Sequence, residues 1–132
     1  MRKSKSIQPT NRATPHLRHL FLAILILACY SGPAAAHAVL VESAPVPEST
    51  SSGPNIAIRL RFNVRIDADR STITIISSDG SGRKLQTLKG PEPNTLTARA
   101  TALQAGGYRI RWQVLASDGH LTSGEIHFSV RG

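Results

Sequence analysis

The sequence predicts an all-β protein, a seven-stranded Greek-key β-barrel or immunoglobulin-like sandwich. Apolar and polar residues alternate with a period of two at 56–62, 108–114 and 126–130. This alternation is typical of half-buried strands that pack one face against a second sheet. Turn-forming residues separate the apolar runs at short intervals and no stretch has a helical period, which favours a sandwich or barrel over a helical fold.

Each strand has its own signal, and the clearest is at 56–62, where four apolar residues share one face. The segment 72–76 (TITII) is rich in β-branched residues, which favour strands. Seven strands are expected in chain order: 39–41, 56–62, 72–76, 84–88, 96–100, 108–114 and 126–130. The turns between them are expected at 44–54, 78–82, 90–94, 105–107 and 117–119.

The inward positions of the alternating strands predict the core. They are Ile58, Leu60, Phe62, Tyr108, Ile110, Trp112, Phe128 and Val130. Trp112 is the expected anchor of this core. Tyr108 follows Gly106-Gly107, where a tyrosine corner would stand; an ordinary buried tyrosine explains the same position equally well.

Residues 1–36 read as a cleaved signal peptide and are therefore excluded from the fold prediction. Residues 1–19 carry five basic side chains and no acid, and 20–28 form an apolar run of nine. Such a run suits a signal peptide, whereas a membrane-spanning helix needs about 20 apolar residues. Ala34-Ala35-Ala36 resembles a cleavage site, so His37 is expected to become residue one and 37–132 to form the one domain. A lipoprotein site at Cys29 is the alternative, and it would leave His37 inside the chain.

Removal of the signal changes the charge and limits the possible ligands. Of 16 Lys and Arg, five precede residue 37, whereas all eight acids follow it, so the mature chain carries 11 − 8 = +3. Its basic residues alternate along presumed strands, which argues against a nucleic-acid surface. The only cysteine and the only methionine of the full sequence, Cys29 and Met1, lie before residue 37. A metal site in the mature chain must therefore use nitrogen and oxygen ligands. After cleavage the chain is expected to be a soluble monomer.

Three residues form a candidate metal site: His37, Asp118 and His120. In an extended chain, residues two apart point to the same side with Cα atoms roughly 6–7 Å apart, so Asp118 and His120 can approach one ion. By itself, Asp118-Gly119-His120 is better explained as a hairpin turn than as a metal site. An N-terminal His37 adds an imidazole and a free amine, and such a nitrogen-rich set suits Cu(II). His127 points outward and is expected to be a surface residue.

An ordered set of short motifs runs through nearly the whole mature chain. They are His37-Ala38-Val39-Leu40, Ser43-Ala44-Pro45, Ser49, Leu60-Arg61-Phe62, Leu103-Gln104-Ala105-Gly106-Gly107-Tyr108, Trp112-Gln113-Val114-Leu115-Ala116-Ser117-Asp118-Gly119-His120, Ser123-Gly124, Phe128 and Val130. In this set the chain resembles the CopC-like periplasmic copper-resistance proteins. The resemblance implies a Greek-key barrel, copper binding in the periplasm, and a Cu(II) site made by His37, Asp118 and His120.

The resemblance also marks two departures and a candidate partner. Some members carry a methionine-rich Cu(I) site, which this mature chain cannot supply. Some have a glutamate near the Cu(II) site, where this chain has Val64 preceded by Asn63. An inner-membrane copper importer of the CopD type is the candidate partner.

The leading function is therefore a Cu(II)-binding protein for copper buffering, resistance or delivery, not an enzyme. One alternative is a copper monooxygenase that uses an N-terminal histidine chelate. Such enzymes are usually longer and have exposed aromatic side chains, whereas the few aromatic residues here fall mostly on inward positions. The other alternative is a metal-free immunoglobulin-like interaction module, which a lipidated Cys29 would favour.

Overall fold

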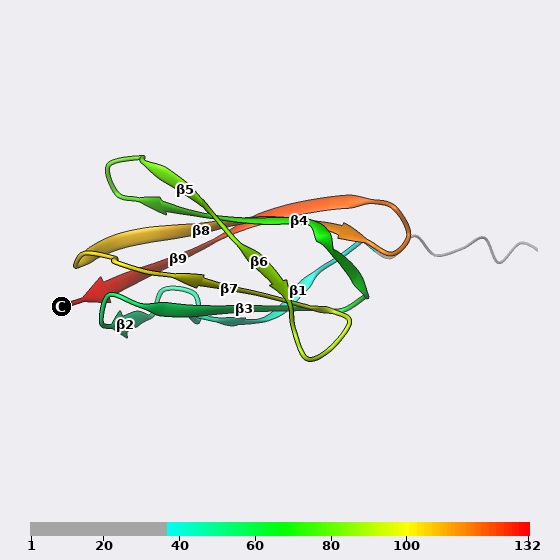
Figure 1. Ribbon diagram of the computed structural model, residues 1–132, viewed down its shortest axis with the longest axis horizontal. Helices are drawn as coiled ribbons and strands as arrows, with labels where there is room; N and C mark the ends of the chain where they lie inside the picture. Colours follow the sequence, from blue (N-terminus) through cyan, green and yellow to red (C-terminus); the bar gives the residue numbers. More distant parts are fainter. Residues whose placement is uncertain (1–36) are drawn as a thin grey trace, which may run out of the picture. The chain divides into compact units, whose positions relative to one another are not determined.

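Two β-sheets form the protein in the computed structural model, which describes residues 37–132 (Figure 1). The strands are β1 (Leu40–Ala44), β2 (Thr50–Ser52), β3 (Ile56–Phe62), β4 (Ile66–Ser77), β5 (Gly82–Leu85), β6 (Thr87–Lys89), β7 (Thr95–Ala100), β8 (Gly106–Ala116) and β9 (Leu121–Arg131). One sheet has the order β1-β3-β7-β6 and the other the order β2-β9-β8-β4-β5. The all-β prediction is confirmed.

The strand count differs from the expected seven for two local reasons. The segment expected at 84–88 is divided at Gln86, where the chain leaves the five-stranded sheet as β5 and enters the four-stranded sheet as β6. The three residues of β2 are Thr50, Ser51 and Ser52, so they have no apolar alternation. They nevertheless pair in parallel with β9, through backbone groups and a hydrogen bond of 3.3 Å that Arg131 donates to Oγ of Ser52. Pairing that depends on the backbone leaves no hydrophobic pattern to read.

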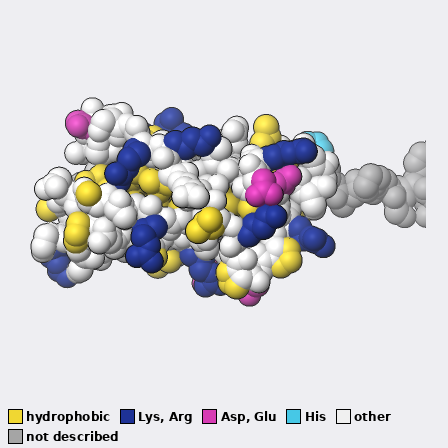
Figure 2. Space-filling view, in the orientation of Figure 1, with side chains coloured by type: hydrophobic (Ala, Val, Ile, Leu, Met, Phe, Trp, Pro, Cys, Tyr) yellow, Lys and Arg dark blue, Asp and Glu magenta, His cyan; other side chains and the backbone are white. Residues whose placement is uncertain are grey.

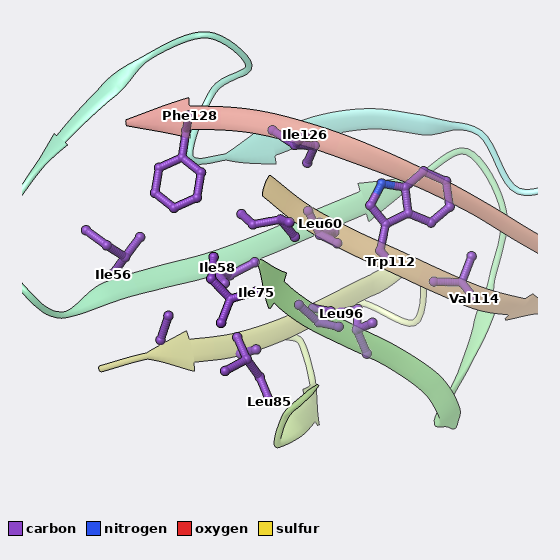
Figure 3. Close-up of a cluster of buried hydrophobic side chains, with 14 of the residues drawn as sticks. Ile56, Ile58, Leu60, Ile75, Leu85, Leu96, Trp112, Val114, Ile126 and Phe128 are labelled. Atoms are coloured by element: carbon purple, nitrogen blue, oxygen red, sulfur yellow. The ribbon is translucent and has the colours of Figure 1, made fainter. Parts of the chain in front are cut away.

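The core lies between the two sheets, where side chains from both interdigitate (Figure 3). Seven of the eight residues predicted to be inward are buried, and Tyr108 is half-buried against them. The rings of Phe62 and Trp112 meet edge to face with their centroids 5.1 Å apart. Edge-to-face packing of this kind stabilises the fold by roughly 0.5–1.5 kcal/mol beyond the contribution of the buried ring area. Trp112 is thus the anchor that the sequence indicates.

Tyr108 forms the contact of a tyrosine corner. Its hydroxyl donates a hydrogen bond of 3.0 Å to the backbone oxygen of Gln104, four residues upstream. Its ring packs on that of Phe128 with centroids 5.8 Å apart. Tyr108 therefore connects the turn before β8 to Phe128 on β9.

On the outward face of each sheet, two arginines form ion pairs with one glutamate. On the four-stranded sheet, Arg59 and Arg61 approach Glu42 at 3.6 and 2.7 Å. On the five-stranded sheet, Arg109 and Arg111 approach Glu125 at 3.4 and 2.8 Å. On the face shown in Figure 2, basic side chains are scattered with acidic ones among them. This distribution agrees with solvated sheet faces and not with a groove for nucleic acid. No helix within 37–132 is long and apolar enough to cross a membrane.

Candidate metal centre

The β8–β9 hairpin turn carries two of the three candidate ligands. The backbone N–H of Ala116 donates to the oxygen of His120, and that of Gly119 donates to the oxygen of Ala116, both at 2.9 Å. Gly119 has a φ of 88°, a left-handed conformation that side chains with a Cβ rarely adopt. Asp118 closes the turn by accepting the backbone N–H of His120 on Oδ1 at 3.0 Å. The hairpin-turn interpretation of this tripeptide is therefore correct.

The same turn also sets up chemistry, because Asp118 has a second carboxylate oxygen. Its Oδ2 lies 3.2 Å from Nδ1 of His120. The side chain of His120 is 52% exposed and that of Asp118 is 27% exposed. Turn formation occupies one oxygen, so the other oxygen and the imidazole remain open to solvent.

The third candidate, His37, reaches this turn on an arm that precedes β1. The next residue, Ala38, is 1% exposed and belongs to the core. Val39 is held on both sides by Asn63: its N–H donates to Oδ1 of Asn63 at 2.7 Å, and its oxygen accepts the N–H of Asn63 at 3.0 Å. The exposed ring of His37 consequently stands beside that of His120, with centroids 5.2 Å apart and planes tilted by 38°. In Figure 1 the start of the arm lies next to the β8–β9 turn.

The structure thus brings together the three residues that the sequence selects, at one end of the sandwich. Within 37–132, no group of three or more His, Cys, Asp or Glu side chains is arranged so that it could hold a metal ion. The side chains of Asp118 and His120 contact each other instead of facing a common point. Because both are exposed, rotation about their side-chain bonds can redirect them without moving the backbone.

Electrostatics keeps Asp118 in the form that binds a cation. The backbone N–H of His120 is the main cause that lowers the pKa of Asp118 below its ordinary value, and the imidazoles of His120 and His37 lower it further. Partial burial acts in the opposite direction. The net effect is an anionic oxygen beside two imidazoles at neutral pH, a donor set that suits a divalent cation of intermediate softness.

His127 occupies the surface position expected from the sequence, and Val64 supplies no ligand. His127 is exposed on β9, 3.9 Å from Oε2 of Glu125. Seven residues of strand separate it from His120, a distance of roughly 20 Å. Val64 is half-buried and packs on the core, so it offers no ligand. The sequence does not mark the role of Asn63, because its contact with Val39 spans 24 residues of sequence.

The fold and these side chains define a small β-sandwich protein with histidine and carboxylate groups exposed at one end. Residues 40–131 match the model of the CopC domain. The chain therefore belongs to the CopC family.

Relatives in sequence and in structure agree with this assignment. The copper resistance protein C of Xanthomonas campestris pv. juglandis is 30% identical over 109 residues, covering 76% of this chain and 85% of that protein. Protein YobA of Escherichia coli K12 is 28% identical over 113 residues, covering 83% and 91% of the two chains. The crystal structure of CopC from Methylosinus trichosporium OB3b has a TM-score of 0.65 at 29% identity and covers 71% of this chain and 93% of its own.

A further solved structure shows how members of the family differ. PcoC of Escherichia coli, described as a methionine-rich copper resistance protein, has a TM-score of 0.63 at 25% identity and covers 73% of this chain and all of its own. The present chain has one methionine, Met1. Of these relatives, the Xanthomonas protein and PcoC are named copper resistance proteins. Membership of the CopC family agrees with the prediction of a binding protein and not an enzyme.

Proposed function

We propose that the chain is exported to the periplasm, cleaved after Ala36, and binds one Cu(II) through His37, Asp118 and His120 for copper buffering or delivery. Three nitrogens would come from the α-amine of His37 and the two imidazoles, and one oxygen from Asp118. Such a set suits the tetragonal geometry of Cu(II). The observation that carries the proposal is the 5.2 Å separation of the His37 and His120 rings beside the Asp118 carboxylate.

The oxidation state follows from the donor atoms. Cu(I) prefers thiolate and thioether ligands. Residues 37–132 contain neither cysteine nor methionine. The relatives that are named for copper resistance support copper as the metal, and the nitrogen and oxygen donors favour its divalent state.

The test begins with the full-length chain produced in a bacterium and purified from the periplasm. Mass spectrometry should find His37 as the first residue. Competition with chelators specific for each oxidation state should find one tightly bound Cu(II) and weak Cu(I) binding. A chain that begins at another residue, or one that prefers Cu(I), would contradict the proposal.

A variant with one methionine inserted before His37 isolates the role of the amine. The insertion converts the amine to an amide, a far poorer ligand at neutral pH, and leaves the core untouched. Cu(II) affinity should fall by roughly a hundredfold or more, since loss of even an outer-sphere partner costs about 10–100-fold. His120→Ala should weaken binding similarly and Asp118→Asn less, because the nitrogen ligands dominate the Cu(II) field.

The matched control is His127→Ala, which removes an exposed imidazole roughly 20 Å from the turn. It should leave Cu(II) affinity unchanged. All variants should keep the thermal unfolding of the metal-free protein. Unchanged Cu(II) affinity in the extended variant would remove the N-terminal chelate from the proposal.

A further inference from the structure

The turn between β3 and β4 contacts both of the segments that carry the candidate ligands. On one side Asn63 makes its two hydrogen bonds with Val39, two residues after His37. On the other side the backbone oxygen of Arg65 accepts the N–H of Ser117 at 3.0 Å, next to Asp118. Three consecutive residues, 63–65, therefore join the N-terminal arm to the β8–β9 hairpin.

This turn is itself held firmly. The N–H of Phe62 donates to the oxygen of Asn94 at 2.9 Å, and the side-chain amide of Asn94 donates back to the oxygen of Phe62 at 2.6 Å. The N–H of Ile66 donates to the oxygen of Pro93 at 3.1 Å. Val64, in the middle of the turn, packs on the core. A turn fixed at both ends and in its middle can serve as a rigid reference for the two segments it joins.

Of the three hydrogen bonds between this turn and the two ligand-carrying segments, only the bond from Val39 N–H to Asn63 Oδ1 depends on a side chain. The others on the turn's ligand-facing sides are made by backbone atoms and persist in most variants. Without Oδ1, the arm before β1 keeps the buried Ala38 and a single backbone bond to Asn63. His37 lies at the outer end of that arm, so any loosening is greatest at its ring and amine.

We infer that Asn63 is a positioning residue: its side chain fixes the arm so that His37 stands beside His120 before any metal binds. The inference rests on the proposed Cu(II) site. Preorganisation of this kind raises affinity by removing the ordering cost of binding. A net hydrogen bond of ordinary strength corresponds to roughly a two- to tenfold change in the population of the ordered arm. Asn63→Ala should therefore weaken Cu(II) binding by about that factor.

Asn55 offers a matched control at the other end of β3. Its Oδ1 accepts the N–H of Ala102 at 3.4 Å, and like Asn63 it is an exposed asparagine that flanks the strand. The seven residues of β3 separate the two by roughly 25 Å. Asn55→Ala removes a contact of the same kind, though a longer one, without touching the arm. Asn63→Asp keeps an acceptor for Val39 and is the conservative rescue variant.

The experiment compares the periplasmic wild-type protein with Asn63→Ala, Asn63→Asp and Asn55→Ala. In the metal-free protein, nuclear Overhauser contacts between the His37 and His120 rings should be present in the wild type, Asn63→Asp and Asn55→Ala, and lost in Asn63→Ala. With Cu(II), Asn63→Ala should show the two- to tenfold loss of affinity and a broadened or doubled electron paramagnetic resonance spectrum.

Two outcomes would overturn the inference: persistent ring contacts in Asn63→Ala, or equal losses of affinity in Asn63→Ala and Asn55→Ala. A third, loss of the ring contacts in metal-free Asn63→Asp, would do so as well. The metal-free measurement keeps the positioning role separate from copper binding. A wild-type protein that shows the ring contacts and binds no Cu(II) would contradict the proposed function and leave the position of the arm established.

Discussion

Substitution of Gly124 by alanine should destabilise the protein, because the new methyl group would overlap the indole of Trp112. Gly124 on β9 stands directly opposite Trp112 on β8. A Cβ placed on Gly124 would lie 2.8 Å from Cε2 of Trp112, 3.2 Å from Cη2, and closer still to Cζ2. The indole also meets the ring of Phe62 from the opposite sheet, whose exposed fraction is 0%. The ring is therefore packed between the strand that carries Gly124 and the opposite sheet.

Two opposing effects decide the sign. An alanine in a compatible backbone restricts the unfolded chain and stabilises the folded state by about 0.4–1 kcal/mol. Against this, the ring must give way by at least 0.6 Å, the difference between 2.8 Å and the 3.4 Å at which ordinary contact begins. Overpacking of a filled core costs about 1–3 kcal/mol. The net loss is then about 1–2 kcal/mol, or roughly 5–15 °C in Tm for a domain of this size.

Thermal unfolding should be followed by circular dichroism. Tryptophan fluorescence is unsuitable, because one comparison variant removes the only tryptophan. Gly107→Ala is the control: a Cβ there meets nothing within 4 Å, so Tm should stay the same or rise. In a Trp112→Phe background, which lacks Cζ2, the cost of Gly124→Ala should shrink by about 1 kcal/mol. A Tm for Gly124→Ala equal to that of Gly107→Ala, or a cost independent of Trp112→Phe, would refute the reasoning.

Two further predictions concern turns. Hydrogen bonds from neighbouring serines lower the pKa of Asp79 to about 2 from 3.8, the serine at position 77 contributing most. A lowered folded-state pKa stabilises the protein above the unfolded value of 3.8, and this stabilisation is lost as pH falls toward 2. Acid titrations of stability should accordingly show Asp79→Asn below the wild type near pH 6, with the gap closing near pH 2; a gap independent of pH would contradict this. Tyr108→Phe removes the hydrogen bond to Gln104 and should cost about 1 kcal/mol, roughly 4–8 °C in Tm, with no effect on Cu(II) affinity; an unchanged Tm would show that the corner contact is unimportant.

The elements that the sequence predicts well are those in which burial alternates along the strand. The expected strand 56–62 coincides with β3, because every second residue there enters the core. The strands β8 and β9 extend beyond 108–114 and 126–130, through Gly106-Gly107 at the start of β8 and mostly through polar residues and Gly124 at the start of β9. Backbone pairing continues there after the hydrophobic pattern has ended. The same reason explains why β2, with three hydroxyl-bearing residues, left no trace in the sequence.

The candidate site divides in the same way. Proximity of Asp118 and His120 follows from their spacing, and the approach of His37 follows from the family resemblance. The turn that joins the two segments could not be predicted, because its bonds connect residues far apart in the chain. Asn63 reaches Val39 across 24 residues, and its local sequence contains nothing that marks it as more than a turn residue. Contacts of this kind depend on the register between strands, which period-two patterns leave undetermined.

Under the proposed function, the donor set is incomplete before the signal peptide is removed. In the full-length chain the backbone nitrogen of His37 belongs to a peptide bond, so it offers copper no amine. Two imidazoles and one carboxylate then remain, and the Asp118 and His120 side chains contact each other. Cleavage after Ala36 would add the amine at the position where the arm already holds His37 beside the hairpin. The step that completes the chelate would thus be the step that ends export, so that tight Cu(II) binding would begin only outside the cytoplasm.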